Sequence, residues 1–542
     1  MLPIAEIAQK LGLSPRDVIP YGQYKAKIAL SAIRSRQKGK LVVVTGITPT
    51  PAGEGKTTTT AGLVQGMGKL GVNVAATLRE PALGPIFGIK GGGTGGGAAR
   101  VEPEDEVNIH FTGDAHAVGS AHNLLAALTD NAAQRGAVPG FLPSGITWRR
   151  VLDVEDRALR SVVTGLGGAN NAPLRETGFD IVTASEVMAI LALATGPADL
   201  RARLGRIVVG FKDDGKPATA KDVGAVGSMM ALMRHALLPN LVQTSEGQPV
   251  FVHAGPFGNI AHGCSSVIAD RLALGYADYV LTEAGFGADL GFEKFMHIKV
   301  RTSGLKPSGA VLVASVRALK SHGGVSAKEF DKPNTGAVEK GMANLEHLIG
   351  VVRSFDLPVV VAINHFPTDT AAEVGVVERR STSAGAHSAV VSKGFAQGGE
   401  GTVELAEALM DAVKGPPPKV SYLYPEKAST EEKVLALAKR VYGAEAVRWN
   451  PAAARQLKRY EELGWGMLPV CMAKTHLSLS HDPALKGRPS GYTFEVSDVR
   501  ASVGAGFIYP IAGTIVTMPG LPGTPRALDV DAKGNITGLS SD

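Results

Sequence analysis

The sequence predicts an α/β protein with a P-loop-type parallel sheet core flanked by helices, and with two smaller α/β domains at the C-terminal end. Three observations support this fold class. Short apolar runs rich in β-branched residues recur, and most are continuous rather than alternating, as in strands that are covered on both faces. Segments with helical periodicity lie between these runs, which favours strand–helix–strand units. A sequence close to the phosphate-binding loop pattern directly follows the first run.

The expected strands and helices alternate along much of the chain. Because parallel sheets bind ligands beyond the carboxyl ends of their strands, the residues that follow each strand are the first candidates for a site. Helices are expected over residues 57–70, 262–274 and 342–355. The apolar runs that predict strands are residues 41–44, 72–76, 206–210, 250–253, 279–282, 311–314 and 358–363.

The stretch TGITPTPAGEGKTTTTAG, after the first run, nearly matches the phosphate-loop pattern of Gly, four residues and Gly-Lys-Ser/Thr, but Thr50 replaces the first Gly. Gly53 and Gly55 are expected to present backbone N–H groups to phosphate oxygens, and the helix that follows points its N-terminus at the same anion. Lys56 is expected to reach the β- and γ-phosphates, and the Thr57 hydroxyl to hold Mg²⁺. The alternative is a Gly-rich turn with a solvated lysine.

Charged residues follow two other runs. Arg79 and Glu80 come after the second run, where Arg79 can grip a carboxylate or a phosphoryl group with two hydrogen bonds. The alternative for this pair is a surface ion pair. Glu283 and Asp289 follow the run at 279–282 and are placed to support Mg²⁺, although ordinary turn carboxylates are equally common there.

Histidine spacing gives no metal pattern. His110, His116 and His122 are six residues apart, which matches neither one helical face nor a zinc motif, so no zinc is expected. We interpret them as structural or as polar lining of a pocket. Asp114, in the segment FTGD, is a candidate carboxylate of the same ambiguous kind as Glu283.

Composition narrows the class of function. Hydrophobic residues make up 44% and charged residues 20% of the 542 residues, as in globular proteins. The net charge of +6 is scattered, which suits small anionic ligands and argues against a nucleic-acid partner. Cys264 and Cys471 are far apart, so no disulfide framework is expected. The N-terminus does not resemble a signal peptide and no apolar run is long enough to span a membrane, so we expect a cytoplasmic protein.

The chain is too long for one ordinary hydrophobic core, so several domains are expected. The segment GPPPKV is typical of a linker, residues 429–442 predict a charged amphipathic helix opened by a Ser-Thr-Glu-Glu cap, and residues 494–518 are rich in strand-forming residues. We divide the chain into a nucleotide-binding α/β domain (1–346), a second α/β domain (347–452) and a C-terminal domain (453–542).

Several short segments in one order are far more specific than a phosphate loop alone. They are TPTPAGEGKTTT (48–59), LREPALGPIFGIKGG (78–92), HFTGDAHAV (110–118), TWRRVLD (147–153), RETGFDI (175–181), NIAHGC (259–264), TEAGFGADLG (282–291), VASVRALKSHGG (313–324), INHFPTDT (363–370), GGEG (398–401), MAKTHLSLS (472–480) and TMPGLP (517–522). Together they resemble the formate–tetrahydrofolate ligase family, the 10-formyltetrahydrofolate synthetases, and the resemblance runs over essentially the whole chain.

The resemblance implies a reaction and a set of ligands. ATP, formate and tetrahydrofolate give 10-formyltetrahydrofolate, ADP and phosphate, with formyl phosphate as the intermediate. The resemblance also implies Mg-ATP, activation by K⁺ or NH₄⁺, and a homotetramer. It places a folate site partly in the second domain. It also accounts for Thr50 at the start of the loop, because the family's loop typically carries Thr-Pro there.

Site residues carry over position by position. Lys56 is expected to steady the transferring phosphoryl group, and Arg79, with its neighbour Glu80, to hold formate and formyl phosphate. Phe286, Phe366 and Phe395 match aromatic positions at the folate, for which core packing is the alternative. The ATP loop comprises Thr50, Pro51, Ala52, Gly53, Glu54, Gly55, Lys56 and Thr57.

Two departures from the family pattern stand out. Ala98 replaces the usual Tyr in GIKGGGTGGGA, so a hydroxyl-bearing ring is expected to be missing or supplied elsewhere. Phe395 replaces the usual Trp before GGEG, which keeps a stacking face and removes the indole N–H. Two other functions are therefore weighed: a P-loop ATPase that drives a protein partner, and an inactive folate-binding relative.

Overall fold

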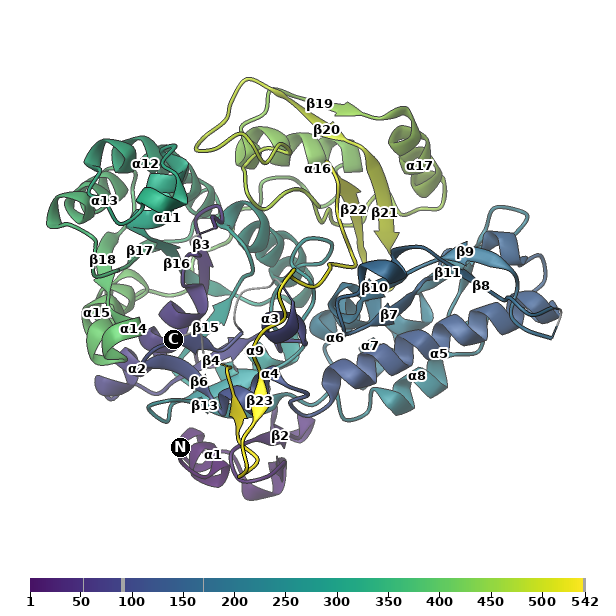
Figure 1. Ribbon diagram of the computed structural model, residues 1–542, viewed down its shortest axis with the longest axis horizontal. Helices are drawn as coiled ribbons and strands as arrows, with labels where there is room; N and C mark the ends of the chain where they lie inside the picture. Colours follow the sequence, from purple (N-terminus) through teal and green to yellow (C-terminus); the bar gives the residue numbers. More distant parts are fainter. Residues whose placement is uncertain (52, 89–92, 169, 540–542) are drawn as a thin grey trace.

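A large, mostly parallel sheet forms the centre of the molecule (Figure 1). The computed structural model describes residues 1–51, 53–88, 93–168 and 170–539. Within these residues the main sheet has 12 strands. This architecture confirms the predicted α/β class. In sheet order the main strands are β1 (Val18–Pro20), β2 (Ala26–Ile28), β13 (Asn240–Thr244), β14 (Pro249–Val252), β4 (Val74–Leu78), β15 (Tyr279–Glu283), β3 (Lys40–Gly46), β16 (Pro307–Ala314), β17 (Val359–Asn364) and β18 (Ser388–Ser392), while β6 (Ala99–Glu102) pairs with β13 and with β5 (Gly95–Gly96).

The strands from β14 to β18 pair in parallel, and the β1–β2–β13–β14 edge is antiparallel. The carboxyl ends of β4, β15, β3, β16 and β17 therefore meet at one edge of the sheet. Six of the seven strands that the apolar runs predict are in this sheet.

Strand β3 shows why its apolar run is continuous. Leu41, Val42, Val43 and Val44 are all fully buried. Val42 and Val44 pack on the face covered by α2 (Lys56–Lys69) and α15 (Val403–Ala412), whereas Leu41 and Val43 pack on the face covered by α9 (Val267–Tyr276) and α12 (Thr335–Arg353). A strand with apolar cores on both sides has no position for a polar side chain.

Further helices complete the layers around the sheet. The predicted helix at 262–274 starts later than expected, at Val267, because Ser266 caps it by accepting a hydrogen bond from the Ala269 amide. Within the described part of the chain, none of the helices combines the length and the apolar character needed to cross a membrane. The other helices of this body are α1 (Ile4–Leu11), α3 (Gly84–Phe87), α4 (Glu104–Asn108), α10 (Arg301–Ser303), α11 (Val316–His322), α13 (Ala371–Ser383) and α14 (Gly394–Gln397).

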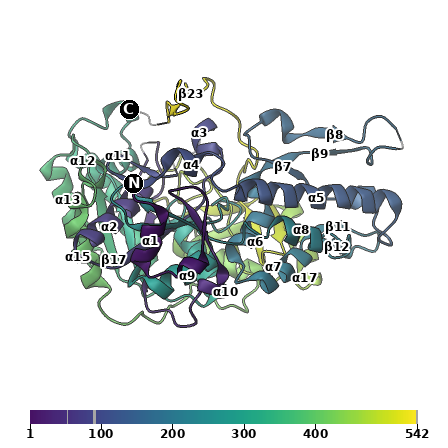
Figure 2. The same cartoon turned by 90° about the horizontal axis from the view of Figure 1, so that it is seen from below.

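A lobe inserted between β6 and β13 projects from the sheet, with α5 and the β8–β9 hairpin extending furthest (Figure 2). Its apolar core also includes residues of the main body and of the C-terminal part, such as Ile268 and Phe507. The strand predicted at 206–210 belongs here as β11, where it forms an antiparallel hairpin instead of joining the parallel sheet. The lobe comprises α5 (Asp114–Arg135), β7 (Arg150–Leu152), β8 (Val162–Thr164), β9 (Arg175–Thr177), β10 (Phe179–Ile181), α6 (Glu186–Leu193), α7 (Pro197–Gly205), β11 (Val208–Phe211), β12 (Pro217–Thr219) and α8 (Val226–Leu232).

The C-terminal part packs across the sheet and the lobe (Figure 1). Its first helix has the predicted capping box: Ser429 accepts from the Glu432 amide and Glu432 accepts from the Ser429 amide. The helix continues into a π-helical turn at Ala438–Tyr442. The elements are α16 (Thr430–Leu437), β19 (Ala446–Trp449), α17 (Pro451–Glu462), β20 (Thr493–Val496), β21 (Asp498–Ser502), β22 (Phe507–Ile511), β23 (Asp529–Val530) and β24 (Ile536–Thr537).

The division of the chain at residues 346 and 452 stays a prediction. Residue 346 lies within α12, and β17 and β18, which belong to the main sheet, come after it. Residue 452 lies at the start of α17.

Candidate active site

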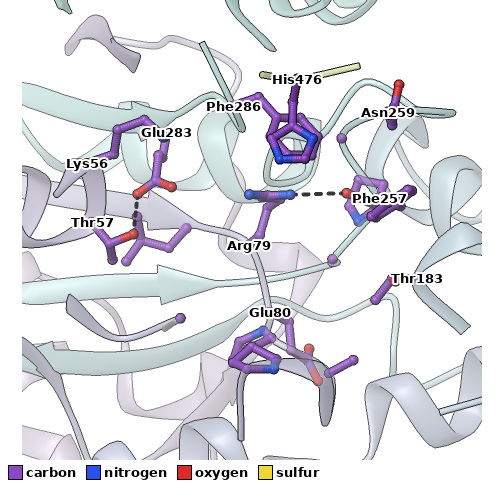
Figure 3. A pocket seen from close by; sticks show the side chains of 18 of the residues that line it. Lys56, Thr57, Arg79, Glu80, Thr183, Phe257, Asn259, Glu283, Phe286 and His476 are labelled. Carbon is purple, nitrogen blue, oxygen red and sulfur yellow. Dashed lines mark hydrogen bonds between the residues drawn. The ribbon is translucent and has the colours of Figure 1, made fainter. Parts of the chain in front are cut away.

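A cavity of about 800 Å³ opens at the carboxyl ends of β3, β4, β14 and β15. This is the edge at which the parallel topology predicts a ligand. Figure 3 shows that side chains from distant parts of the sequence point into it. They include Lys56, Thr57, Arg79, Glu80, Thr183, Phe257, Asn259, Glu283, Phe286 and His476.

The segment between β3 and α2 has the geometry of a phosphate loop. Gly53 and Gly55 have φ of 70° and 75°, a left-handed conformation that favours glycine. The amide of Thr50 donates to the buried Glu54 carboxylate at 2.7 Å, and Thr50 is not among the described residues with positive φ. Position 50, where the loop begins, therefore does not require a glycine, which explains why a threonine can occupy it.

The loop brings its charged residues to the cavity. Gly53, Glu54, Gly55, Lys56 and Thr57 line it, and Lys56 Nζ lies 3.7 Å from a Glu54 oxygen. Helix α2 begins at Lys56, so its N-terminus faces the cavity. Thr50 and Pro51 precede this part and are not among the lining residues, and Ala52 lies outside the described residues.

Two acidic candidates have different surroundings. The Thr57 hydroxyl donates to Glu283 Oε2 at 2.9 Å, which places a carboxylate and a hydroxyl side by side at the start of α2. Asp289 is fully buried and forms an ion pair with Lys474 at 2.7 Å. Its charge is already compensated, so Glu283 is the better of the two for a cation beside the loop.

Arg79 points into the middle of the cavity (Figure 3). Its Nη1 donates to the Pro256 carbonyl oxygen at 3.4 Å. A Cβ on Gly285 would lie 2.9 Å from Arg79 Nη2, so that glycine makes room for the guanidinium. The rings of Phe257 and Phe286 meet edge to face, with centroids 6.5 Å apart, and line the same cavity.

Glu80 is buried rather than paired with Arg79 at the surface, so the surface ion pair weighed for these residues is not what forms. Its amide donates to the carbonyl of Ala254, a residue with φ of 55°. Burial and the neighbouring Asp114 carboxylate raise the pKa of Glu80 well above its usual range, although Lys27 opposes the shift. Asp114 itself forms a buried ion pair with Lys27 at 2.8 Å.

The match to known proteins covers the chain almost completely. The family model for formate–tetrahydrofolate ligase matches residues 1–540. The chain belongs to the formate–tetrahydrofolate ligase family. It is 53% identical to the formate–tetrahydrofolate ligase of Desulforamulus reducens over 552 aligned positions, which cover 99% of this chain and 97% of that protein. The enzymes of the same name from Roseiflexus sp. strain RS-1 and Myxococcus xanthus are 53% and 51% identical, with coverage of 99% of this chain and 98% of each relative.

In this member of the ligase family the three candidate folate residues do not lie in one cavity. Phe286, with φ of 56°, lines it and stacks on His476. Phe366 is not among the lining residues and lies against Arg317, whose guanidinium carbon is 4.2 Å from the ring centroid. Phe395 is 59% exposed. Phe366 and Phe395 follow β17 and β18, which are neighbours in the sheet, so both lie at its carboxyl edge.

The two departures from the family pattern are neighbours in space. The Ala98 amide donates to the Phe395 carbonyl oxygen at 2.8 Å. Ala98 is exposed, and its own carbonyl accepts from Ser245 Oγ at 2.6 Å. The ring of Phe395 lies close to Gly96. A side chain at position 98 therefore lies beside Phe395, and Ala98 is not among the residues that line the cavity with Lys56 and Arg79.

His110, which precedes α5, and His116 and His122 within it do not form a metal site with one another. His122 is buried, stacks on Trp148, and bonds through its ring nitrogens to Ser185 Oγ and the Arg149 carbonyl. Across the residues that the structure describes, no group of three or more His, Cys, Asp or Glu side chains is arranged to hold a metal ion. Cys264 and Cys471 are both buried and free.

Sequence reasoning did not single out several residues of this cavity, among them Thr183, Phe257, Asn259 and His476. Asn259 and His476 lie within segments that carry the family resemblance, NIAHGC and MAKTHLSLS. His476 follows no expected strand, and Asn259 lies six residues beyond the expected strand 250–253, so neither stands directly at the end of a strand.

Proposed function

We propose that this chain joins formate to tetrahydrofolate in the cavity between the phosphate loop and Arg79, using ATP and releasing 10-formyltetrahydrofolate, ADP and phosphate. One observation carries the proposal. Lys56 and Thr57, at the start of α2, line the same cavity as Arg79, so a cradle for a triphosphate and a guanidinium for a small anion adjoin each other. Membership of the ligase family supplies the identity of that anion.

In the first step we propose that a formate oxygen attacks the γ-phosphorus of ATP. A P–O bond to formate forms, the bond to the β–γ bridging oxygen breaks, and ADP leaves. Lys56 and the N–H groups at the start of α2 balance the charge on the phosphates, while Arg79 orients formate for an in-line approach. The product of this step is formyl phosphate.

In the second step the N10 amine of tetrahydrofolate attacks the formyl carbon. A C–N bond forms, the C–O bond to phosphate breaks, and the amine proton leaves to phosphate or water. Arg79 lies where it can stabilise the oxygen that gains charge during this attack. Burial and Asp114 raise the pKa of Glu80, which weakens its tendency to pair with the guanidinium as a carboxylate would.

The residues present fit Mg²⁺ bound with ATP. Thr57 and Glu283 contribute a hydroxyl and a carboxylate oxygen that lie 2.9 Å apart, and Mg²⁺ prefers oxygen ligands, of which the protein commonly supplies only one or two. When bound, the ion neutralises charge on the β- and γ-phosphates. Thr57 and Glu283 then hold and orient the triphosphate side of the site.

For tetrahydrofolate we propose contacts with Phe286 inside the cavity and with Phe366 and Phe395 at the neighbouring carboxyl edge of β17 and β18. Flat rings at these positions suit the pterin. Activation by K⁺ or NH₄⁺ and a homotetramer in the cytoplasm complete the proposal, on the strength of the family resemblance. Replacing K⁺ by a large organic cation tests the activation, and the mass of the native particle by light scattering tests the tetramer.

The deciding experiment measures ADP release with ATP alone, with formate, and with formate and tetrahydrofolate, alongside formation of 10-formyltetrahydrofolate. Net turnover that needs both substrates supports the ligase. ADP release that is independent of formate, or absence of the formylated product, contradicts it. These results would instead support a P-loop ATPase that drives a protein partner or an inactive folate-binding relative, respectively.

A further inference from the structure

His476 occupies the cavity without a role in the reaction described so far. Its imidazole stacks on Phe286, with ring centroids 4.8 Å apart and planes inclined by 24°. Arg79 lines the same cavity, and Figure 3 shows both side chains pointing into it. Its ring nitrogens form no hydrogen bond with any other residue that the structure describes. A polar ring held in a substrate cavity without a protein partner is available to a ligand.

The segment that carries His476 is anchored from beneath. Lys474, two residues earlier, is fully buried and donates to Asp289 at 2.7 Å and to the Ser478 carbonyl at 2.5 Å. The Lys474 amide also donates to Asn259 Oδ1 at 3.1 Å. Asp289 belongs to the π-helical turn that follows Phe286. One buried ion pair thus ties the two partners of the stack together and fixes the orientation of the imidazole.

The charge state of His476 is set by its surroundings. Burial lowers its pKa first, and the nearby Lys474, Lys56 and Lys486 lower it further, while only Asp289 acts in the other direction. The imidazole is therefore neutral near pH 7, with one N–H donor and one accepting nitrogen. Beside Lys56 and Arg79 it adds directed hydrogen bonding without a third positive charge.

The stack also limits what Phe286 can do. One face of its ring is covered by His476, and Gly258 lies so close to the ring that a Cβ there would come within 3.1 Å of it. Phe286 can therefore contact the folate proposed above only with the part of its ring that His476 leaves uncovered. The imidazole forms the polar part of this wall of the cavity, and Phe286 supports it.

We propose that His476 is a ligand-contacting residue, whose imidazole hydrogen-bonds the formyl or carboxylate oxygen of the small acyl group held at Arg79. The inference rests on the function proposed above and deepens it, because it assigns the second polar partner of that group. Together the guanidinium and the imidazole orient the planar acyl group for both steps.

Two substitutions separate stacking from hydrogen bonding. His476→Phe keeps a flat ring on Phe286 and removes both nitrogens, whereas His476→Gln removes the ring and keeps a neutral donor and acceptor. We expect His476→Phe to lower kcat/KM for formate by about tenfold or more, and His476→Gln to stay within about threefold of the parent protein, as for a lost and a retained hydrogen bond. His116→Ala, on the exposed side of α5, is the control and leaves the kinetics unchanged.

The readouts distinguish a substrate contact from a structural role. KM for ATP and the melting temperature should stay near parent values in His476→Phe, while the formate kinetics change. Parent-like kcat/KM for formate in His476→Phe overturns the inference. Equal losses in the Gln and Phe variants, with a shifted pH–rate profile, overturn it in favour of proton transfer. If the parent protein itself lacks turnover dependent on formate and tetrahydrofolate, the proposed function fails; if the parent protein is active and His476→Phe matches it, only the present inference fails.

Discussion

The hydroxyl of Thr57 donates a 2.9 Å hydrogen bond to Glu283, which joins the first turn of α2 to the carboxyl end of β15. These residues are 226 positions apart in the sequence, and the parallel pairing of β3 with β15 brings them together. The pair gives the phosphate loop its acidic partner.

Replacing Glu283 by Gln should weaken the use of Mg-ATP. The loss of one negative oxygen beside Thr57 removes a charge that holds the ion, so we expect a Mg²⁺ requirement raised by about tenfold and a lower kcat. Titration of activity with Mg²⁺ at saturating ATP measures this. Glu329→Gln, at an exposed carboxylate paired with Lys332, serves as the control. An unchanged Mg²⁺ titration in Glu283→Gln removes Glu283 from the ion's surroundings.

Replacing Arg79 by Ala should impair formate use more than ATP binding. The guanidinium projects into the cavity from the end of β4, whereas the loop residues hold the nucleotide. We expect kcat/KM for formate to fall by about a hundredfold or more, as for loss of a charge-assisted pair, and the affinity for ATP to change little. Arg135→Ala, at the far end of α5, is a matched control on an exposed arginine. Formate kinetics that survive the Arg79 substitution contradict its role.

Replacing Phe366 by Ala should raise the KM for tetrahydrofolate and leave that for ATP unchanged. Loss of a stacking ring corresponds to roughly 1 kcal/mol or more, about a fivefold change in KM. Phe366 also packs on Arg317, so the melting temperature is measured in parallel. A fall in melting temperature with an unchanged KM for tetrahydrofolate shows that Phe366 belongs to the core and not to the folate site.

Stability should depend on pH through buried histidines. Burial lowers the pKa of His253 to about 4, while its ring nitrogens bond to Ser266 Oγ at 2.6 Å and to the Ala236 carbonyl at 2.7 Å. Between about pH 6.5 and pH 4 the unfolded chain binds a proton at this site and the folded chain does not. The free energy of unfolding is therefore highest above pH 6.5 and falls on acidification, by up to about 1.4 kcal/mol per pH unit for this one histidine.

Urea unfolding at pH 7 and pH 5 checks the effect of His253. His253→Gln is expected to be less stable at pH 7 and to show a smaller drop between the two pH values than the parent protein. His235→Gln, at an exposed histidine, should keep the parent dependence. If the drop is the same with and without His253, the acid sensitivity has another origin.

Local chemistry made the centre of the fold predictable. A strand such as β3, covered on both faces, must be continuously apolar, and a Gly-x-Gly-Lys-Thr turn after it needs positive φ at both glycines, which Gly53 and Gly55 have. The capping box at Ser429 could also be predicted from the sequence, because its two hydrogen bonds lie within four residues.

Long-range assembly was not predictable from the same patterns. Residues 206–210 have the apolar character of a buried strand, but their partner is the adjacent hairpin strand β12 in a separate lobe. His476 enters the cavity because Lys474 binds Asp289, which is far away in the sequence. The hydrophobic periodicity of the sequence does not predict such a long-range ion pair. Likewise, only the fold shows that Ala98 and Phe395, which depart separately from the family pattern, touch each other.

The most direct test of the central claim compares ADP release by the parent protein and by Lys56→Ala, with and without formate and tetrahydrofolate. Lys69→Ala, at the other end of the same helix, is the matched control. We predict ADP and 10-formyltetrahydrofolate in equal amounts from the parent protein and from Lys69→Ala only when both substrates are present, and a loss of at least about a hundredfold in Lys56→Ala. ADP release by the parent protein that does not depend on formate, or near-normal ligation by Lys56→Ala, would contradict the account.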